Sequence, residues 1–205
     1  MGKKRRILLA VLLVAVFGGI ALLLIPSPEP VYEGKPLSAW LHSVQTNWLI
    51  QNQNQKQEQK QDRLAILQIG SNGIKELLEM ARAKDSPLKK QMMALARKQT
   101  LIPIIFHTAQ DDHVMAGAGF EILGATGRDA VPALIDLLKS EDVDVRLTAA
   151  DCLGKIGPNA KAAIPFLLQS LDDTDRIVRL DATFNLGEIH MQPDMAVPVL
   201  INKLN

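Results

Sequence analysis

Apolar and polar residues recur with a helical period along most of this chain, and one pattern of apolar positions occurs three times near its C-terminal end. In each copy an apolar segment ends at Leu-Gly, and a second apolar segment then opens at a proline. These prolines are Pro132, Pro165 and Pro198, which are evenly spaced along the chain. A fixed period of about 33 residues predicts stacked pairs of helices, in which each pair covers the next.

Acidic residues and glycines indicate where these helices begin and end. We expect the clear repeats to cover residues 111–205. The first helices should run from Asp112 to Leu123-Gly124, from Asp142 or Asp144 to Ile156, and from Asp175 to Ile189. The second helices should run from Asp129 to about Lys139, from Ala160 to Leu171, and from Met195 to Leu204.

A weaker form of the same pattern, over residues 37–110, predicts degenerate helices. A helix that begins near Leu37 would place Trp40, Val44 and Trp48 on one side. Such a stripe could be a ligand platform, but its spacing favours packing in the core. Glutamine occupies every odd position from 51 to 61, which indicates either an exposed extension of a helix or a flexible insertion.

Two further segments complete the upstream half. Ser86 and Pro87 predict the start of another helix, with Ser86 as the N-cap. The apolar segment 101–106 is broken by Pro103, and we expect it to be a buried connection rather than a strand.

The N-terminal end carries an uninterrupted apolar run from Ile7 to Ile25, preceded by four basic residues. As a helix this run would be about 28 Å long, which matches the hydrocarbon core of a bilayer. We therefore expect residues 1–25 to be a signal anchor with a cytoplasmic N-terminus, residues 26–36 to be a proline-rich spacer, and residues 37–205 to be an exported domain. The alternative is a signal that is cleaved after Ala21, which would release the protein.

Composition agrees with helices packed on helices, because 47% of the residues are hydrophobic while only 4% are aromatic. The net charge is only +1, and the sequence contains no long basic stripe with interleaved aromatic residues. We therefore expect no nucleic-acid partner. The basic stretch from Lys75 to Lys98 is expected to be a solvated helix face. The single cysteine, Cys152, lies where a small core residue belongs and is expected to be buried and inert.

One copy of the repeat has the form Asp-x-x-Val-Arg-x-x-Ala-Ala-x-x-Leu-Gly-x-Ile-Gly. Its members are Asp142, Val145, Arg146, Ala149, Ala150, Leu153, Gly154, Ile156 and Gly157. The next copy repeats Asp175, Val178, Arg179, Ala182, Leu186, Gly187 and Ile189, but has Thr183 and His190 where the pattern has Ala and Gly. This pattern resembles a HEAT repeat, and more narrowly the bacterial phycobilisome-lyase type. The resemblance implies an all-α solenoid that binds proteins, and it specifies no partner.

Signatures of catalysis are not found in the sequence, so we expect a protein that is not an enzyme and holds no cofactor. His107 and His113 flank Asp111-Asp112, which makes a metal site conceivable. We favour the simpler interpretation, in which Asp112 caps a helix and both histidines face solvent. The arginines Arg146 and Arg179 are expected to pair with acids at helix ends of their own or the neighbouring repeat and so to tie the stack together, with Asp142, Asp144 and Asp175 as candidate partners.

A partner surface is expected on the second helices. The period places Asp136, Gln169 and Asn202 at equivalent positions, and Lys139, Asp172 and Asn205 form a second possible row. The alternative is an ordinary solvated surface. Val199, Leu200 and Leu204 could leave an apolar face open for self-association.

Together these patterns predict a membrane-anchored scaffold for an unknown protein partner. The alternatives are a chromophore-lyase-like or other enzyme accessory protein, and a purely structural spacer.

Overall fold

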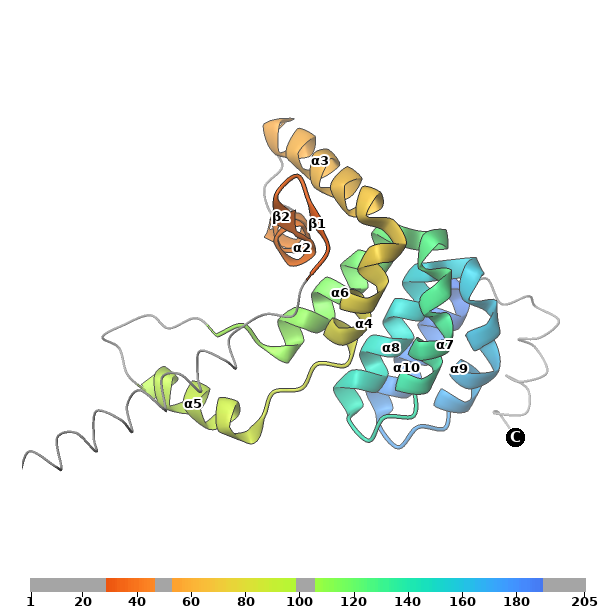
Figure 1. Cartoon of the computed structure of the whole chain (residues 1–205). Coiled ribbons are helices and arrows are strands. Elements are labelled where there is room, and N and C mark those ends of the chain that lie inside the picture. Colours follow the sequence, from red (N-terminus) through yellow and green to blue (C-terminus); the bar gives the residue numbers. More distant parts are fainter. Residues whose placement is uncertain (1–28, 47–52, 99–105, 190–205) are drawn as a thin grey trace, which may run out of the picture.

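The computed structural model describes residues 29–46, 53–98 and 106–189, and these form a mostly helical array with one short hairpin (Figure 1). The predicted anchor at 7–25, Trp48, most of the predicted connection at 101–106, Asn202, Asn205 and the predicted helix from Met195 to Leu204 lie outside these residues. Within the three described ranges, no helix combines the length and the apolar character needed to cross a membrane.

The described chain opens with a hairpin of two short antiparallel strands, β1 (Val31–Tyr32) and β2 (Lys35–Pro36). Glu33 and Gly34 both have positive φ angles, 49° and 77°, which form the tight turn between the strands. The indole Nε1 of Trp40 donates to the carbonyl oxygen of Tyr32 at 3.2 Å, which fixes the hairpin on the next helix. Residues 31–36, the second part of the predicted spacer, therefore form a hairpin that is bonded to α2.

Three helices and a 3₁₀ turn follow the hairpin and build the upstream half of the core. Trp40 is only 3% exposed, which confirms its expected core position. The part of the glutamine run that the structure describes belongs to a helix, which confirms the first of the two interpretations of this segment. The elements are α2 (Leu37–Thr46), α3 (Gln53–Ile69), the 3₁₀ turn η2 (Gly70–Gly73) and α4 (Ile74–Ala81).

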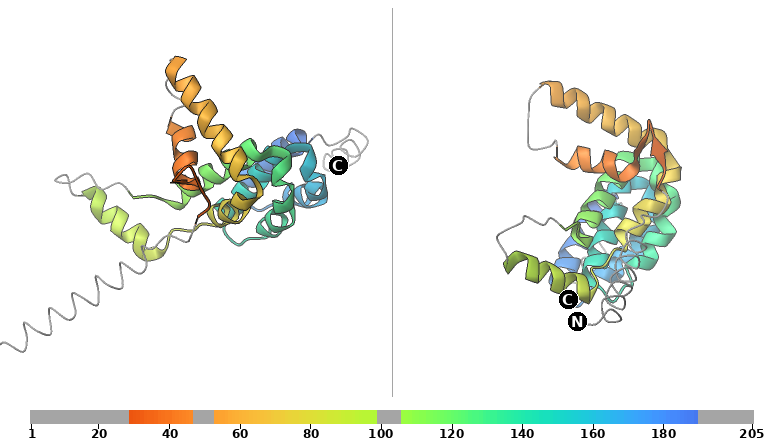
Figure 2. Two further views of the ribbon diagram at one scale, coloured as in Figure 1. Left: turned by 45° about the horizontal axis from the view of Figure 1, so that its top comes forward. Right: turned by 60° about the vertical axis from the view of Figure 1, so that its left-hand side comes forward.

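Helix α5 (Pro87–Lys98) begins where the sequence predicts, and the hydroxyl of Ser86 accepts from the amide of Lys89 at 3.2 Å as an N-cap. It does not join the stack. In both views of Figure 2, α5 lies apart from the packed helices of the described ranges.

The repeats occupy the rest of the described chain. The first helices, α6, α8 and α10, pack side by side, and α7 and α9 lie along them as second helices (Figure 1). Gly124 and Gly157, with φ angles of 47° and 70°, end α6 and α8. The elements are α6 (Ala109–Leu123), η3 (Gly124–Ala130), α7 (Val131–Leu137), α8 (Val143–Ile156), η4 (Gly157–Ala163), α9 (Ile164–Ser170) and α10 (Arg176–Glu188).

Several predicted helix boundaries are corrected by the structure. Helix α6 begins after Thr108 rather than at Asp112, because Thr108 and Asp111 form a reciprocal capping box. The second helices begin at Val131 and Ile164, later than expected, because a 3₁₀ turn precedes each of their prolines. The expected caps Asp142 and Asp175 are confirmed, and each carboxylate accepts a backbone amide of the following helix.

One continuous apolar core joins the upstream helices to the repeats. Phe120 of α6 is a fully buried member of this core, which also includes Leu153 of α8 and Leu186 of α10. Cys152 is fully buried within it, as expected. The surfaces of the repeats are thereby held on a rigid support.

Candidate interaction surfaces

Arg146, at the start of α8, is buried and binds the loop that precedes α10. Its Nε and Nη2 each donate to one carboxylate oxygen of Asp173 at 2.8 Å. Its Nη1 donates to the carbonyl oxygens of Ser140 and Glu141, at 2.8 and 3.2 Å. One guanidinium therefore joins the α7–α8 loop to the α9–α10 loop.

The same position of the repeat carries a nitrogen donor in each of three first helices. The Nη1 of Arg179 donates to the carbonyl oxygens of Asp173 and Thr174, which lie one repeat period beyond the two carbonyls that Arg146 binds. His113 occupies this position in α6, and its Nε2 donates to the carbonyl oxygen of Ala83 at 3.0 Å. Each side chain thus donates to carbonyl oxygens in a loop outside its own helix.

These contacts correct two expectations. Arg146 hydrogen-bonds Asp173, rather than Asp142, Asp144 or Asp175, because the first two are on its own helix start and Asp175 caps α10. His113 is buried at 7% exposure and does not face solvent. His107 is exposed, as expected, and its Nε2 contacts Asp112 at 2.6 Å.

The residues singled out on the second helices are exposed wherever the structure describes them. Asp136 and Lys139 extend from the end of α7, and Gln169 and Asp172 occupy the equivalent positions on and after α9. We call these four residues the second-helix row. The Nζ of Lys139 lies 3.2 Å from an oxygen of Asp136 and 5.5 Å from the centre of the Phe166 ring.

A small cavity of about 120 Å³ lies between α7 and α9 at the second-helix row. Lys139 and Gln169 line it beside Phe166 and Asp173. A cavity with an aromatic wall and charged edges can accept one side chain of a partner. Asp173 therefore belongs both to this cavity and to the ion pair with Arg146.

Helix α10 shows a second exposed area, which is apolar. Ile177, Leu180 and Phe184 are 61%, 58% and 62% exposed. Its Thr183 and Gly187 are also exposed, whereas the equivalent Ala150 and Gly154 of α8 are buried. In α8 this side receives the next first helix, since Gly154 lies against Asn185 of α10. The described part of the chain contains no helix that covers the same side of α10.

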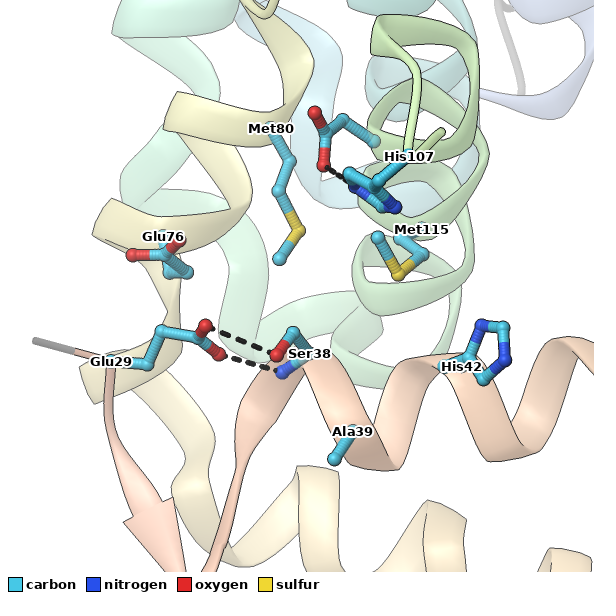
Figure 3. A pocket seen from close by; sticks show the side chains of 9 residues that line it. Glu29, Ser38, Ala39, His42, Glu76, Met80, His107 and Met115 are labelled. Carbon is cyan, nitrogen blue, oxygen red and sulfur yellow. Dashed lines mark hydrogen bonds and ion pairs between the residues drawn. The ribbon is translucent and has the colours of Figure 1, made fainter. Parts of the chain in front are cut away.

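A second hollow, of about 420 Å³, lies at the upstream end between α2, α4 and α6 (Figure 3). Glu29 accepts from the backbone amide and hydroxyl of Ser38 at 2.8 and 3.0 Å, and Met80 and Met115 face the same space. Burial, followed by the nearby Glu29 and Glu79 carboxylates, raises the pKa of Glu76. Within the described ranges, no group of three or more His, Cys, Asp or Glu side chains is placed to hold a metal ion.

Comparison with known families agrees with this architecture. A family model described as HEAT repeats matches residues 98–187, the segment that runs from the end of α5 almost to the end of α10. Residues 98–187 form HEAT-like repeats. A search of curated proteins gives no match.

Two carboxylates on the first helices of consecutive HEAT-like repeats, Asp151 and Asp181, interact electrostatically. Asp181 of α10 is half-buried and accepts from the side-chain amide of Asn185 at 3.0 Å. Burial, with the charge of Asp151 adding to it, raises the pKa of Asp181 to about 6. Burial also raises the pKa of Asp151, although Lys155 opposes this shift.

Sequence reasoning missed Asp173, which links the repeats and lines the cavity. Its local sequence predicts a linker residue, because nothing there distinguishes it from Asp172. The period itself was the available signal, because Asp173 is equivalent to Ser140, whose carbonyl oxygen accepts from Arg146.

Proposed function

We propose that this chain is a membrane-tethered scaffold for protein–protein interaction, and that a protein partner binds its second-helix row. The HEAT-like repeats support the general role, since such arrays bind proteins through extended surfaces. In this proposal residues 7–25 hold the chain in the membrane, and the repeats lie on the exported side.

The observation that carries the proposal is the second-helix row and its cavity. Asp136 and Gln169 are both exposed on consecutive second helices, at equivalent positions of the repeat. The cavity beside them combines the Phe166 ring with Lys139 and Asp173. Protein interfaces commonly contain an aromatic pocket surrounded by polar groups, and this arrangement offers one on a rigid support.

The test is capture of partners by the full chain after crosslinking in cells, beside a variant that carries Asp136→Lys, Gln169→Lys and Asn202→Lys. We expect the parent to capture a specific protein and the variant to lose it while retaining its helical circular dichroism. Equal capture by both would contradict a role for the second-helix row. Bound colour in the purified protein would instead favour a chromophore-lyase-like activity.

A matched control places new lysines at equivalent exposed positions away from this row. Asp129 of η3 and Ala162 of η4 are exposed and lie one repeat period apart. The variant Asp129→Lys with Ala162→Lys adds a comparable charge, so it should keep the partner. Loss of capture in this control would mean that charge alone, rather than the second-helix row, governs binding.

The tether requires its own test, because it rests on the sequence of residues 7–25. We expect the full chain to stay with membranes through an alkaline carbonate wash, and a protease added outside intact spheroplasts to digest the repeats. Release by the wash would contradict the anchor. Release of a shortened chain into the medium would favour the cleaved signal.

Self-association through the C-terminal repeat is a further part of the proposal. Its support is the exposed apolar side of α10, which comprises three large side chains, Ile177, Leu180 and Phe184. Sedimentation of the full chain in detergent should show a concentration-dependent dimer that is weakened by Leu180→Ser with Phe184→Ser. A monomer at all concentrations would contradict it.

A further inference from the structure

Helix α5 exposes an apolar stripe that no other described element covers. Leu88, Met92 and Leu95 are 66%, 50% and 66% exposed. Their spacing of four and three residues places them on one side of the helix. An isolated helix of this length is marginal in water, so a surface that receives its apolar side would also stabilise it.

The charge of α5 is basic and unopposed within the helix. Its sequence contains Lys89, Lys90, Arg97 and Lys98 and no acidic residue. Lys89 pairs with Asp85, just before the helix, and Lys90 is exposed. A helix with an apolar stripe and several bases is complementary to a surface that is apolar below and negatively charged above.

The N-terminal end of α5 lies at the same edge of the molecule as the start of the described chain. The carboxylate of Asp85 accepts from the amide of Ala109 at 3.1 Å, which holds the N-terminal end of α5 beside the N-terminal end of α6. Glu29 lines a hollow together with His107 and Asp112, which are at this same end of α6 (Figure 3). Residue 29 follows the predicted anchor by only four positions.

We propose that α5 is an interfacial helix that lies on an anionic lipid surface, with Leu88, Met92 and Leu95 immersed at the boundary between headgroups and acyl chains. Its position beside the membrane rests on the proposed tether, whereas its affinity for anionic lipid is its own property. Lipid is favoured over an acidic protein groove because the bases and the stripe occur at the edge from which the anchor would leave. The helix would orient the repeats relative to the membrane.

The experiment uses the full chain with Met92→Cys, labelled with an environment-sensitive fluorophore. Cys152 is fully buried, so the label goes to the new cysteine. The labelled chain is reconstituted into vesicles of phosphatidylcholine alone, or of equal parts phosphatidylcholine and phosphatidylglycerol. We expect a blue shift, and quenching by spin-labelled acyl chains, in the anionic vesicles and much less of both in the neutral ones.

Three variants serve as controls. A label at Leu180→Cys, which is similarly apolar and exposed but on α10, should show no quenching by spin-labelled acyl chains. Adding Lys90→Glu to the Met92→Cys chain should weaken the anionic preference several-fold, whereas Lys161→Glu, an exposed lysine of η4, should leave it unchanged. Equal effects of the two charge changes would overturn the proposal.

The outcomes separate this proposal from the tether. A label that stays in water while the chain resists an alkaline wash would overturn the role of α5 and leave the tether intact. If the wash removes the chain, the tether fails, and the labelled chain is then added to preformed anionic vesicles. A lipid-quenched shift in that assay would still support α5, and no shift would overturn it. A shift without lipid quenching would indicate contact with protein and would also overturn it.

Discussion

Arg146 and Asp173 form a bidentate ion pair with two hydrogen bonds of 2.8 Å, and their side chains are only 11% and 12% exposed. The pair joins the first helix of one HEAT-like repeat to the loop that leads into the next. The Arg146 guanidinium lowers the pKa of Asp173, and Asp173 raises the pKa of Arg146. Both shifts mean that the charged forms are favoured in the folded chain.

Replacing Arg146 by alanine should destabilise the repeats. The change would remove the donor of the Ser140 and Glu141 carbonyls and the counter-charge of Asp173, which would keep its hydrogen bond from the amide of Asp175. Breaking such a pair typically costs about 3 kcal/mol. Urea unfolding followed by circular dichroism would measure the change in the free energy of unfolding.

The control for this prediction is a double-mutant cycle with Asp173→Asn. The coupling energy should be about 1 kcal/mol or more, because the two side chains touch directly. Arg179→Ala is the matched comparison, since Arg179 makes the equivalent carbonyl contacts. Arg179 is more exposed than Arg146, and its hydrogen bonds within the described residues go to carbonyl oxygens. Its replacement by alanine should therefore lower the free energy of unfolding by less. Equal losses in the two variants would contradict a special role for the ion pair.

Gly154→Ala should also destabilise the chain. A Cβ at this position would collide with the side-chain amide of Asn185, which is 1% exposed and cannot move toward solvent. Overpacking of this kind costs about 1–3 kcal/mol, and here it would separate α8 from α10. Thermal unfolding would show the loss. Gly187→Ala is the control, because nothing lies within 4 Å of its Cβ position, and it should have little effect.

Asp181 should make the folded chain less stable as the pH rises from about 4 to 6. Its pKa in the folded chain is about 6, above its ordinary value of 3.8, so folding favours the protonated form. The stabilisation from protonated Asp181 is complete below the ordinary pKa of 3.8, and it is lost as the pH rises through 6. Asp181→Asn should therefore stabilise the chain at pH 7 by about 1 kcal/mol, after allowance for its partial exposure to solvent.

Urea unfolding at pH 4 and at pH 7 checks this prediction, by comparing the free energies of unfolding of the parent and of Asp181→Asn. The difference should be small at pH 4 and larger at pH 7. Asp175→Asn, the same substitution at the helix cap of α10, serves as the control for the loss of one carboxylate. A difference that does not change with pH would contradict the raised pKa of Asp181.

Cys152 should resist alkylation as long as the repeats are folded. It is fully buried, and burial raises the pKa of its thiol well above the ordinary value, with Asp151 adding to the shift. Thiolate is the reactive form, so both access and ionisation are suppressed. Pulsed labelling with iodoacetamide in increasing urea should follow the unfolding transition. Rapid labelling in buffer would indicate that α8 opens locally.

The repeat period predicted the stack and the place of most repeat helices, because the same apolar positions are required in every copy. The period also marked Arg146 and Arg179 as equivalent. The period did not give the correct helix start where two capping residues lie close together, as Thr108 and Asp112 do at the start of α6. Thr108 outcompetes Asp112 because its backbone can form a reciprocal box with Asp111, and this geometry depends on the fold of the preceding loop.

Other features depend on contacts that no local pattern contains. Asp173 reaches Arg146 only after α9 has folded back, so its role could not be separated from that of its neighbour Asp172. The start of α5 was predicted from Ser86 and Pro87, but its separation from the stack was not, because that depends on which surfaces the rest of the folded chain offers. The hairpin at Glu33-Gly34 was hidden for a similar reason, since it depends on the donor from Trp40.

The glycines on the first helices have a consequence for evolution of the stack. Gly117 of α6 makes room for Asp151 of α8, since a Cβ there would lie 2.7 Å from its carboxylate, and Gly154 of α8 makes room for Asn185. The position equivalent to Gly154 in α6 is Glu121, so α10 could not be seated on α6 without a clash. The repeats are therefore not interchangeable modules, and an unequal crossover that deleted or duplicated one of them would join surfaces that do not fit.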